Sequence, residues 1–332
     1  MSTPGRRVTS AEVAKHSGVS RATVSYVLNG NPNQSISSQT RQRVLDAAER
    51  LGYTPSAPAR ALRSGRSDVV LFLLPEWPIG PTIARLVEDL TRSLAASRLT
   101  LLLHTHPRSA RPVADLWKAI TPAAVINHQA LTDDEVQVIR RAGIPVIAPS
   151  YQLGGAATFA DFQHAIGRTQ VEHLAATGHR RLGFALPDDD RLLAFAQPRL
   201  DGARRACTRL GLDHPATQTV SLSAHSATQA IDYWRRTPPR ITGICAYNDE
   251  VALAILAGMR TRRLAAPHHL AVIGVDNIPA GALTDPALTT ITTGMSALGQ
   301  HLATAVVNTL AGKPIEPGPD QDLLQLIRRD SA

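Results

Sequence analysis

Two groups of polar residues have the chemistry and the position to bind a ligand. Near the N-terminus, Arg21, Ser25 and Tyr26 lie off the apolar stripe of a short helical segment, where polar side chains can contact DNA in the major groove. Further along the chain, Asn248 and Asp276 each lie just past an apolar run typical of a buried strand. Amides and carboxylates at strand ends can hydrogen-bond the hydroxyl groups of a small molecule. These residue types indicate DNA contact in one region and small-molecule binding in the other.

The positive charge of the chain is concentrated in its first fifth. The 332 residues include 35 Lys and Arg against 27 Asp and Glu, a net charge of +8. Residues 1–67 hold 10 basic and 3 acidic side chains, whereas residues 68–332 hold 25 and 24. Because neutralised phosphate groups supply most of the non-specific affinity for DNA, this distribution favours a nucleic-acid partner for the N-terminal segment.

Several classes of protein are disfavoured by composition. Cys207 and Cys245 are the only cysteines and form no CxxC pair, which argues against a disulfide framework or a structural zinc site and suits a reducing cytoplasm. Residues 1–10 lack the apolar core of a signal peptide, and the chain has no run of about 18 apolar residues. We therefore expect a cytoplasmic protein without a membrane segment.

Three short helices are predicted to position the basic N-terminal residues. Their N-caps are Thr9, in a capping box with Glu12, then Ser20 and Ser37. The helices are expected to end near residues 17, 28 and 51, and Gly18 separates the first two. Two short helices joined by a glycine turn and followed by a third are typical of a helix-turn-helix. The alternative is a small three-helix bundle with a solvated basic face.

The same segments resemble the head of the LacI/GalR (lac repressor/galactose repressor) family. The resemblance is carried by Val8–Gly30, by Ser37–Pro55 and by Ala59–Ser67, which is similar to the hinge helix and linker of that family. It implies a sequence-specific DNA-binding transcriptional regulator, expected to be a repressor. Two departures are a slightly longer loop at Asn31–Gln34 and Pro58 early in the hinge helix, which is tolerated only if the helix begins near Ser56.

The resemblance also implies roles for individual residues of the head. Arg21, Ala22 and Tyr26 match positions that face base edges. Positions that contact the DNA backbone are matched by Thr9, Ser20, Thr23, Ser25, Asn29 and Ser37. Leu62 matches the leucine that two hinge helices insert into the minor groove, where the loss of base stacking is offset by extra wrapped surface. The alternative for Leu62 is a buried contact between hinge and body.

Short apolar runs alternate with helical patterns from Asp68 onward. Strands are predicted at residues 69–74, 100–103, 123–126, 145–148, 181–185, 243–246 and 269–275. Such alternation predicts parallel sheets with helices on both faces. The expected fold class is an all-α helix-turn-helix head followed by an α/β body, similar to periplasmic binding proteins, of two doubly wound lobes. A ligand would bind beyond the carboxyl ends of the strands, in the cleft between the lobes.

Enzyme motifs that use this architecture are missing. The chain has no G-x-G-x-x-G after a strand, no phosphate-binding G-x-x-x-x-G-K-[ST], no G-x-S-x-G and no H-E-x-x-H. His268 and His269 are more typical of a solvated loop than of a metal site, whereas His104 and His106 leave a strand end and fit a ligand contact or a solvated loop equally well. We expect no enzymatic activity, no cofactor and no metal. A periplasmic-type binding protein, whose body is similar, is one rival, and the missing signal peptide and the helix-turn-helix argue against it. A sugar-processing enzyme is the other, and the chain lacks a matched acid/base or nucleophile constellation for it.

The resemblance extends through the body. It is carried by Val171–Phe184, Arg199–Gly202, Ala246–Leu253, Val272–Pro279 and Leu288–Ile291. It implies that Arg199, Asn248 and Asp276 contact the effector and that Met295 forms a wall. The alternative is an Arg199–Asp276 ion pair that closes the lobes without ligand. Asp249 is expected to cap the helix that follows it.

Two departures in the body bear on the effector. Ala165 stands where sugar-binding members often carry Asp, and the first strand leads into Pro75–Gly80 rather than an Asp-x-x-Asn-Pro-Phe type of segment. Trp77 in that segment is predicted either to stack on a sugar ring or to pack under the loop. The effector is therefore expected to be a sugar or a related metabolite rather than necessarily a plain sugar.

The order of segments predicts a chain that crosses between lobes more than once. The expected divisions are a helix-turn-helix domain at 1–55, a hinge helix and linker at 56–67, an N-terminal effector lobe at 68–160 plus 292–320, and a C-terminal effector lobe at 161–291 plus 321–332. Leu323–Ile327 is predicted as a closing strand. No heptad segment follows it, so we expect a homodimer that binds a pseudo-palindromic operator.

Overall fold

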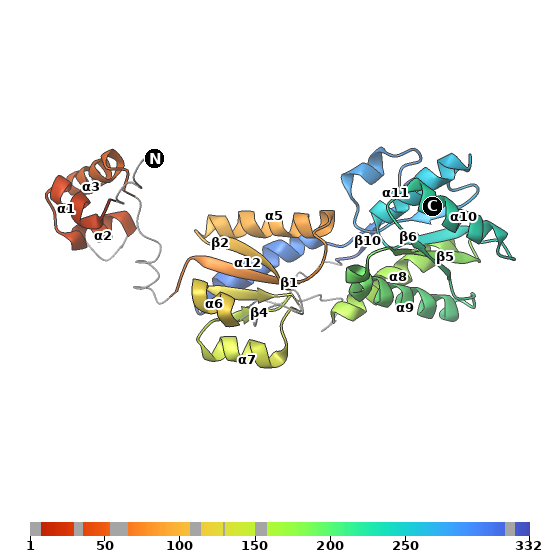
Figure 1. Ribbon diagram of the computed structural model, residues 1–332, viewed down its shortest axis with the longest axis horizontal. Helices are drawn as coiled ribbons and strands as arrows, with labels where there is room; N and C mark the ends of the chain where they lie inside the picture. Colours follow the sequence, from red (N-terminus) through yellow and green to blue (C-terminus); the bar gives the residue numbers. More distant parts are fainter. Residues whose placement is uncertain are drawn as a thin grey trace, which may run out of the picture. The chain divides into compact units, whose positions relative to one another are not determined.

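Two units can be distinguished in the computed structural model, Met1–Asp68 and Val69–Ala332, and they are drawn in Figure 1. The structure describes residues 8–29, 36–53, 66–106, 114–128, 130–149, 158–315 and 323–332. The predicted hinge and linker lie mostly outside these ranges. The division predicted from the sequence, into a helix-turn-helix domain, a hinge and two lobes, is finer than the observed division into two units. This finer division stays a prediction.

The first unit contains the three predicted helices. They are α1 (Ser10–Ser17), α2 (Arg21–Asn29) and α3 (Ser38–Arg50). Thr9 donates its backbone N–H to the Glu12 carboxylate at 2.7 Å, and the hydroxyls of Ser20 and Ser37 accept backbone N–H groups at 3.1 and 3.2 Å. Val13, Val24 and Val44, one from each helix, are fully buried against one another. The predicted helices and their caps are confirmed.

A four-stranded parallel sheet begins the second unit, with strand order β2-β1-β3-β4. Its strands are β1 (Val69–Pro75), β2 (Thr100–His106), β3 (Ala124–Asn127) and β4 (Val146–Ile147). Alternate residues of β1 face opposite sides, so that Phe72 packs against one pair of helices and Leu73 against the other. The first pair is α5 (Pro81–Ala96) and α12 (Met295–Leu310), and the second is α6 (Ala114–Ile120) and α7 (Asp133–Arg141).

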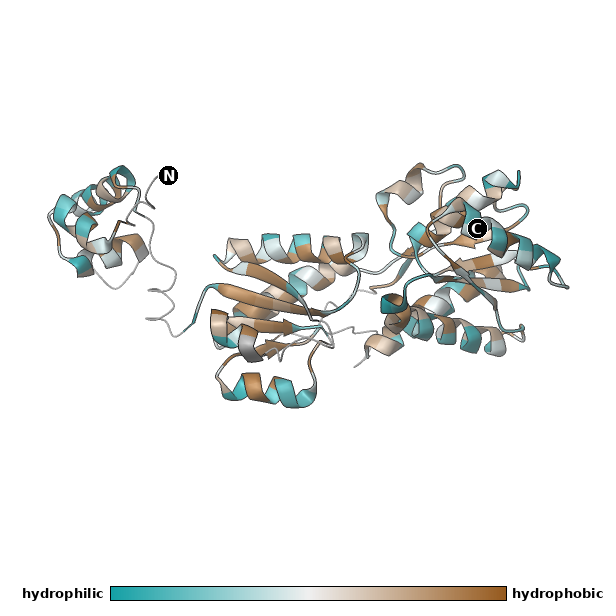
Figure 2. Cartoon of the chain, in the orientation of Figure 1, coloured by the Kyte–Doolittle hydropathy of each residue, from teal (hydrophilic) through white to brown (hydrophobic). Residues whose placement is uncertain are grey.

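A second four-stranded parallel sheet follows, with order β6-β5-β7-β8. Its strands are β5 (Leu182–Pro187), β6 (Ala216–Val220), β7 (Gly243–Ala246) and β8 (Ala271–Ile273). One face packs against α8 (Phe159–Ala176) and α9 (Leu193–Arg209), and the other against α10 (Ala224–Arg236) and α11 (Asp249–Thr261). Figure 2 shows strands that are mostly brown between helices that carry teal residues. The predicted doubly wound architecture is confirmed.

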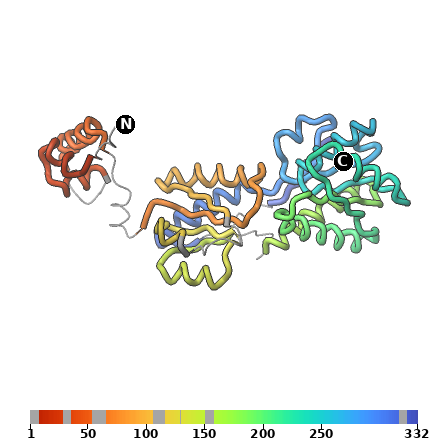
Figure 3. The backbone as a smooth tube through the Cα atoms, viewed as in Figure 1, coloured from red at the N-terminus to blue at the C-terminus, as the bar shows by residue number. Residues whose placement is uncertain are grey.

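Short elements connect the two sheets. After η2 (Pro279–Leu283), the chain forms β9 (Thr290–Thr292), which pairs antiparallel with β10 (Gln325–Ile327). Between these strands it enters α12, which returns to pack on α5, as the backbone trace in Figure 3 shows. The predicted closing strand is observed as β10. All of the predicted strands are present with small shifts at their ends, whereas β6 and β9 were not predicted.

Helices α8 and α9 pack unusually closely, and this packing positions one of the predicted ligand residues. A Cβ atom on Gly167 would lie 1.9 Å from the carbonyl oxygen of Arg199, and one on Gly202 would lie 2.1 Å from that of His164. Glycine is therefore required at both positions. The close approach brings Arg199 of α9 beside Gln163 of α8.

No helix among the described residues is long and apolar enough to cross a membrane.

Candidate functional site

Helix α2 presents the side chains that were predicted to contact DNA bases. Val24 and Val27 are buried, whereas Arg21 and Ala22 are exposed and Tyr26 is half-buried. The structure therefore places the apolar stripe of α2 inward and the predicted base-reading residues outward or at the edge. A helix of this kind presented by two others can enter a major groove.

The hydroxyls predicted to contact the DNA backbone lie at helix starts. Thr9 and Ser20 are exposed next to the N-termini of α1 and α2, and Ser37 is exposed next to that of α3. Thr23 and Ser25 are half-buried on α2. Free backbone N–H groups at helix N-termini favour phosphate binding. Leu62 and the side chain of Asn29 lie outside the described residues.

Arg199 is held from two sides in the second unit. It is only 5% exposed. Its Nε donates to the Gln163 side-chain oxygen at 2.6 Å, a second guanidinium nitrogen donates to the Tyr247 carbonyl at 2.6 Å, and the group lies 4.7 Å from the centroid of the Tyr247 ring. These contacts fix the guanidinium plane without a carboxylate partner. No ion pair within 4.0 Å joins it to Asp276 or to any other described residue.

Asp276 lies in the loop after β8 and has a strained backbone. Its φ is +106°, in the left-handed half of conformational space that non-glycine residues seldom adopt. Although part of the residue is accessible, its carboxyl group is surrounded by protein, and this burial raises the pKa of Asp276 to about 6 against the lowering effects of Arg199 and the Thr82 hydroxyl. Thr82 Oγ1 is itself buried without a hydrogen-bond partner in good geometry.

The prediction for Asp249 is wrong, because its neighbour caps the helix. Asn248 is the N-cap of α11, and its side-chain oxygen accepts the Val251 N–H at 2.9 Å. Asp249 is fully buried and accepts the Ile278 N–H at 2.8 Å and the Thr290 hydroxyl at 2.6 Å. The helix starts one residue earlier than expected, so Asp249 points back into the protein. There it fixes the loop that carries Asp276.

Trp77 belongs to an aromatic cluster beneath the loop that follows β1. It is 7% exposed, and its ring centroid lies 4.4 Å from Phe195, 5.0 Å from His128 and 5.7 Å from Phe159. Of the two alternatives, the structure shows the indole packed under the loop. Trp77 lines neither of the two cavities that collect the other predicted effector residues. Its contact with an effector stays a prediction.

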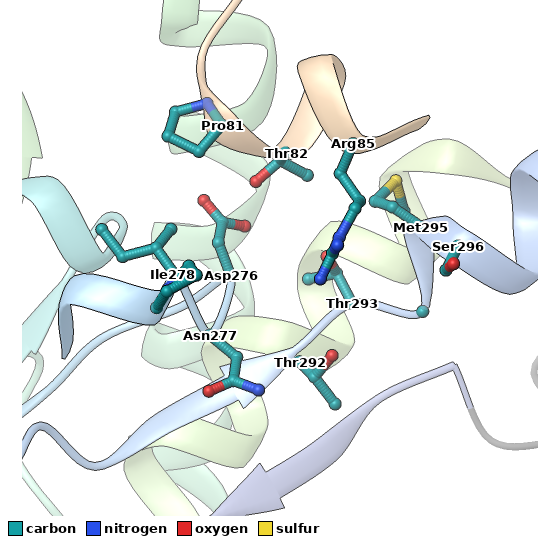
Figure 4. Close-up of a pocket in the computed structure, with 12 residues that line it drawn as sticks. Pro81, Thr82, Arg85, Asp276, Asn277, Ile278, Thr292, Thr293, Met295 and Ser296 are labelled. Atoms are coloured by element: carbon teal, nitrogen blue, oxygen red, sulfur yellow. The ribbon is translucent and has the colours of Figure 1, made fainter. Parts of the chain in front are cut away.

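Two adjoining cavities collect the other predicted effector residues. The smaller, of about 90 Å³, is lined by Arg199, Asn248 and Asp276. The larger, of about 180 Å³, is lined by Asp276 and Met295, as Figure 4 shows. Both cavities share Asp276 with Pro81 and Thr82 of α5. The described structure thus brings four of the five predicted effector residues to one pair of cavities.

Several residues that line these cavities were not predicted. They include Thr82, Arg85, Phe195, Tyr247, Glu250, Thr292 and Thr293. One signal for Thr82 was available, because α5 follows the carboxyl end of β1 and its first turn must lie at the ligand-binding edge of the sheet. His269 bonds within its own turn, to the backbone of Ala265. No group of three potential metal ligands is found among the residues that the structure describes.

Comparison with known proteins finds a family match within each of the two units. Residues 9–56 match the model for bacterial regulatory proteins of the lacI family, and residues 171–332 match the periplasmic binding protein-like domain. The chain belongs to the LacI/GalR family. Its expected fold class and the resemblance of its head are thereby confirmed. As a LacI/GalR member the chain is a DNA-binding transcriptional regulator under effector control, and not an enzyme.

Individual relatives span almost the whole chain. Catabolite control protein A of Priestia megaterium is 27% identical over 88% of this chain and 89% of its own length. The HTH-type transcriptional regulator GntR of Pseudomonas aeruginosa is 28% identical over 98% of this chain and 96% of its own. Among solved structures, the lac repressor dimer bound to operator and the anti-inducer ONPF has a TM-score of 0.79 at 22% identity, covering 98% of this chain and 99% of its own. A CelR–cellobiose complex has a TM-score of 0.62 at 24% identity, covering 98% of this chain and 100% of its own.

Proposed function

We propose that this LacI/GalR protein is a cytoplasmic homodimeric repressor whose effector is a small polyhydroxylated molecule held by Arg199, Asn248 and Asp276. One observation carries the effector assignment. Arg199 and Asp276 line the same cavity, both largely enclosed by protein, and do not pair with each other. Enclosed groups of opposite charge that face a cavity without pairing are suited to a ligand that supplies both acceptors and donors.

The DNA-binding part of the proposal rests on α2 and the charge around it. Arg21 is exposed on a short helix that two other helices support. In a homodimer two such helices would be related by a two-fold axis, so the operator would consist of two inverted half-sites. The lac repressor, to which the chain is similar in fold, has been solved as a dimer on its operator. This supports the same assembly here.

The effector acts through the elements that line the cavity. Thr82 comes from α5, which packs on the first sheet, whereas Asp276 follows β8 of the second sheet. A ligand that contacts both stabilises one relative arrangement of the two sheets and shifts the population of the dimer toward it. Thermodynamic linkage then requires operator DNA to change the affinity for effector by the same factor as the effector changes the affinity for operator.

The experiment begins with selection of operator sites from random DNA by the full-length protein. We expect an inverted repeat, and we expect sedimentation to show a dimer at the protein concentrations used. Polyhydroxylated metabolites are then screened for release of the selected DNA, and a promoter that carries the site is transcribed with and without the protein. A repressor lowers transcription, and the effective metabolite restores it.

Asp276→Asn separates the effector site from the DNA-binding surface. The variant keeps the size of the side chain but removes the carboxylate, so we expect operator binding within about threefold of the wild type and a loss of release by the metabolite. Selection of sites without symmetry, together with a monomer in sedimentation, would contradict the dimeric assignment. Normal release by Asp276→Asn would contradict the assignment of the pocket.

A further inference from the structure

The larger cavity is lined by a positively charged side chain, Arg85, that is not among the residues proposed to bind the hydroxyl groups of the effector. Arg85 is on the second turn of α5 and lines the cavity of about 180 Å³, and Figure 4 shows its side chain running toward Thr293 and away from Pro81. It is exposed, and no hydrogen bond or ion pair links it to another described residue. Arg92, further along the same helix, is by contrast tied to Glu88 and Asp89 at 2.7 and 2.9 Å.

The N-terminus of α12 forms part of the same wall. This helix starts at Met295, and its N-cap is Gly294, which has no side chain to occupy the free backbone N–H groups of the first turn. Met295 and Ser296 of that first turn both line the cavity. The helix has 16 residues, so that its dipole places partial positive charge at this end.

The position of the α12 N-terminus is fixed from behind. The Ser296 hydroxyl donates to the Asp89 carboxylate of α5 at 2.5 Å, and Arg92 compensates the charge of that carboxylate. Gly299 of α12 packs against the backbone of Leu86, since a Cβ atom on this glycine would lie only 3.2 Å from the Leu86 carbonyl oxygen. Arg85 and the first turn of α12 are therefore held on one side of the cavity by the packing of the two helices.

The opposite side of the cavity carries a carboxyl group, that of Asp276, instead of positive charge. In Figure 4 the Asp276 carboxyl group points toward Pro81 and Thr82, at the seam where the two cavities meet. A carboxylate at the seam accepts hydrogen bonds from hydroxyl groups and repels an anion. A ligand that spans the seam would thus place hydroxyls at Asp276 and negative charge beyond it, beside Arg85.

We propose that the effector is a polyhydroxylated metabolite that carries one anionic group, a phosphate or a carboxylate, and that Arg85 and the N-terminus of α12 bind this group. The inference rests on the proposed effector site and adds the chemical class of its ligand. Arg85 binds the anion by a charge-assisted fork, and the backbone N–H groups of α12 complete the site. Arg199, Asn248 and Asp276 retain the hydroxyl-bearing part.

The test compares matched ligands by titration calorimetry on the full-length protein. Neutral hexoses, pentoses and disaccharides are each measured beside their aldonate, uronate and phosphate derivatives, which distinguishes a carboxylate from a phosphate. Inorganic phosphate is measured separately by its effect on thermal unfolding, because it probes the anion site without a sugar skeleton. The variants are Arg85→Gln, Arg85→Lys and Arg168→Gln, the last an exposed arginine of α8 outside both cavities that controls for the change in net charge.

The expected result is an anionic derivative that binds at least about tenfold tighter than its neutral parent, consistent with one charge-assisted contact. Arg85→Gln should reduce this preference to less than threefold, Arg85→Lys should keep part of it, and Arg168→Gln should keep all of it. Operator affinity should be the same in all variants. A tight neutral ligand whose anionic derivatives bind no better, or a preference that survives in Arg85→Gln, overturns the proposal.

A result with inorganic phosphate distinguishes this proposal from the proposed function. If no sugar, charged or neutral, binds or releases operator, the polyhydroxylated effector is wrong. Stabilisation by phosphate that Arg85→Gln abolishes would then still support the anion site, whereas equal stabilisation of both proteins would overturn it as well.

Discussion

The two units differ in how they hold the polar residues that were singled out from the sequence, by local contacts at the surface in one and by distant contacts in the interior in the other. In the first unit, Thr9, Ser20 and Ser37 are exposed and bond to groups three positions away in the chain. In the second unit, Arg199 and Asp249 are buried and bond to groups 36 and 41 positions away. A surface group can exchange its partner for water at little cost, whereas a buried charge that loses its partners is expensive. We infer that residues of the DNA-reading face can be replaced without loss of the fold, whereas replacement of Arg199 or Asp249 destabilises the second unit.

Arg199→Ala should have the largest effect and tests the buried side of this comparison. We expect effector affinity to fall about 100-fold and the free energy of unfolding to fall by about 2–4 kcal/mol, because the Gln163 oxygen and the Tyr247 carbonyl each lose a donor. Calorimetry and denaturant titration measure the two quantities. Operator affinity of the folded variant serves as the control and should stay within about threefold. Normal effector binding would show that Arg199 is only structural.

Arg21→Ala is the mirror test on the exposed side. Operator affinity should fall by about 10- to 100-fold, the range for one lost base contact. Because Arg21 is exposed and outside the helical core, thermal stability and effector affinity should not change. Binding to the selected operator is compared with binding to random DNA. An equal loss for both would assign Arg21 to phosphate contact rather than to base reading.

The pH dependence of stability should differ between the units because of Asp249. Burial raises its pKa to about 7, so the folded state binds a proton that the unfolded state releases above about pH 4. The contribution of Asp249 to stability is therefore largest at low pH, falls by up to about 1.4 kcal/mol per pH unit between about pH 4 and pH 7, and is constant above that.

Asp249→Asn checks this assignment. The amide cannot ionise, so the fall in unfolding free energy of the second unit between pH 6 and 7 should shrink, since Asp276, with a pKa of about 6, titrates mainly below that window. Denaturant titration at closely spaced pH values measures how the free energy of unfolding changes with pH. An unchanged slope in the variant would mean that Asp249 is ionised throughout in the folded protein.

Ser20 gives the smallest expected effect and separates two roles of one hydroxyl. Its oxygen caps α2 by accepting the Thr23 N–H, and loss of such a cap costs about 1 kcal/mol. Ser20→Ala should lower the stability of the first unit by this amount and weaken operator binding, whereas Ser20→Asn restores the cap. If Ser20→Asn recovers stability but not operator affinity, the hydroxyl also contacts DNA, as the family resemblance implies.

The same contrast explains what the sequence could predict. The helices of the head follow from local signals, because Thr9, Ser20 and Ser37 cap helices within three residues. Asn248 and Asp249 show the limit, since both are good N-caps in sequence and only the distant partners of Asp249, Ile278 and Thr290, decide between them. Trp77 has no local signal that separates packing from ligand stacking. Arg85 was missed because an exposed helical arginine is ordinary until α12, a segment distant in sequence, is placed beside it.

The return of α12 to the first sheet has a consequence for how the protein is made. The ribosome releases α5 and β1 early, but the apolar face they share with Leu298 and Leu302 stays uncovered until α12 emerges. Because synthesis proceeds at about 5–20 residues per second, the second sheet can pack against its own helices before α12 is available to cover the first sheet. The second sheet and its helices, although translated later, can therefore fold before the first sheet. A chain that ends before α12 would expose the apolar face of the first sheet and would tend to aggregate.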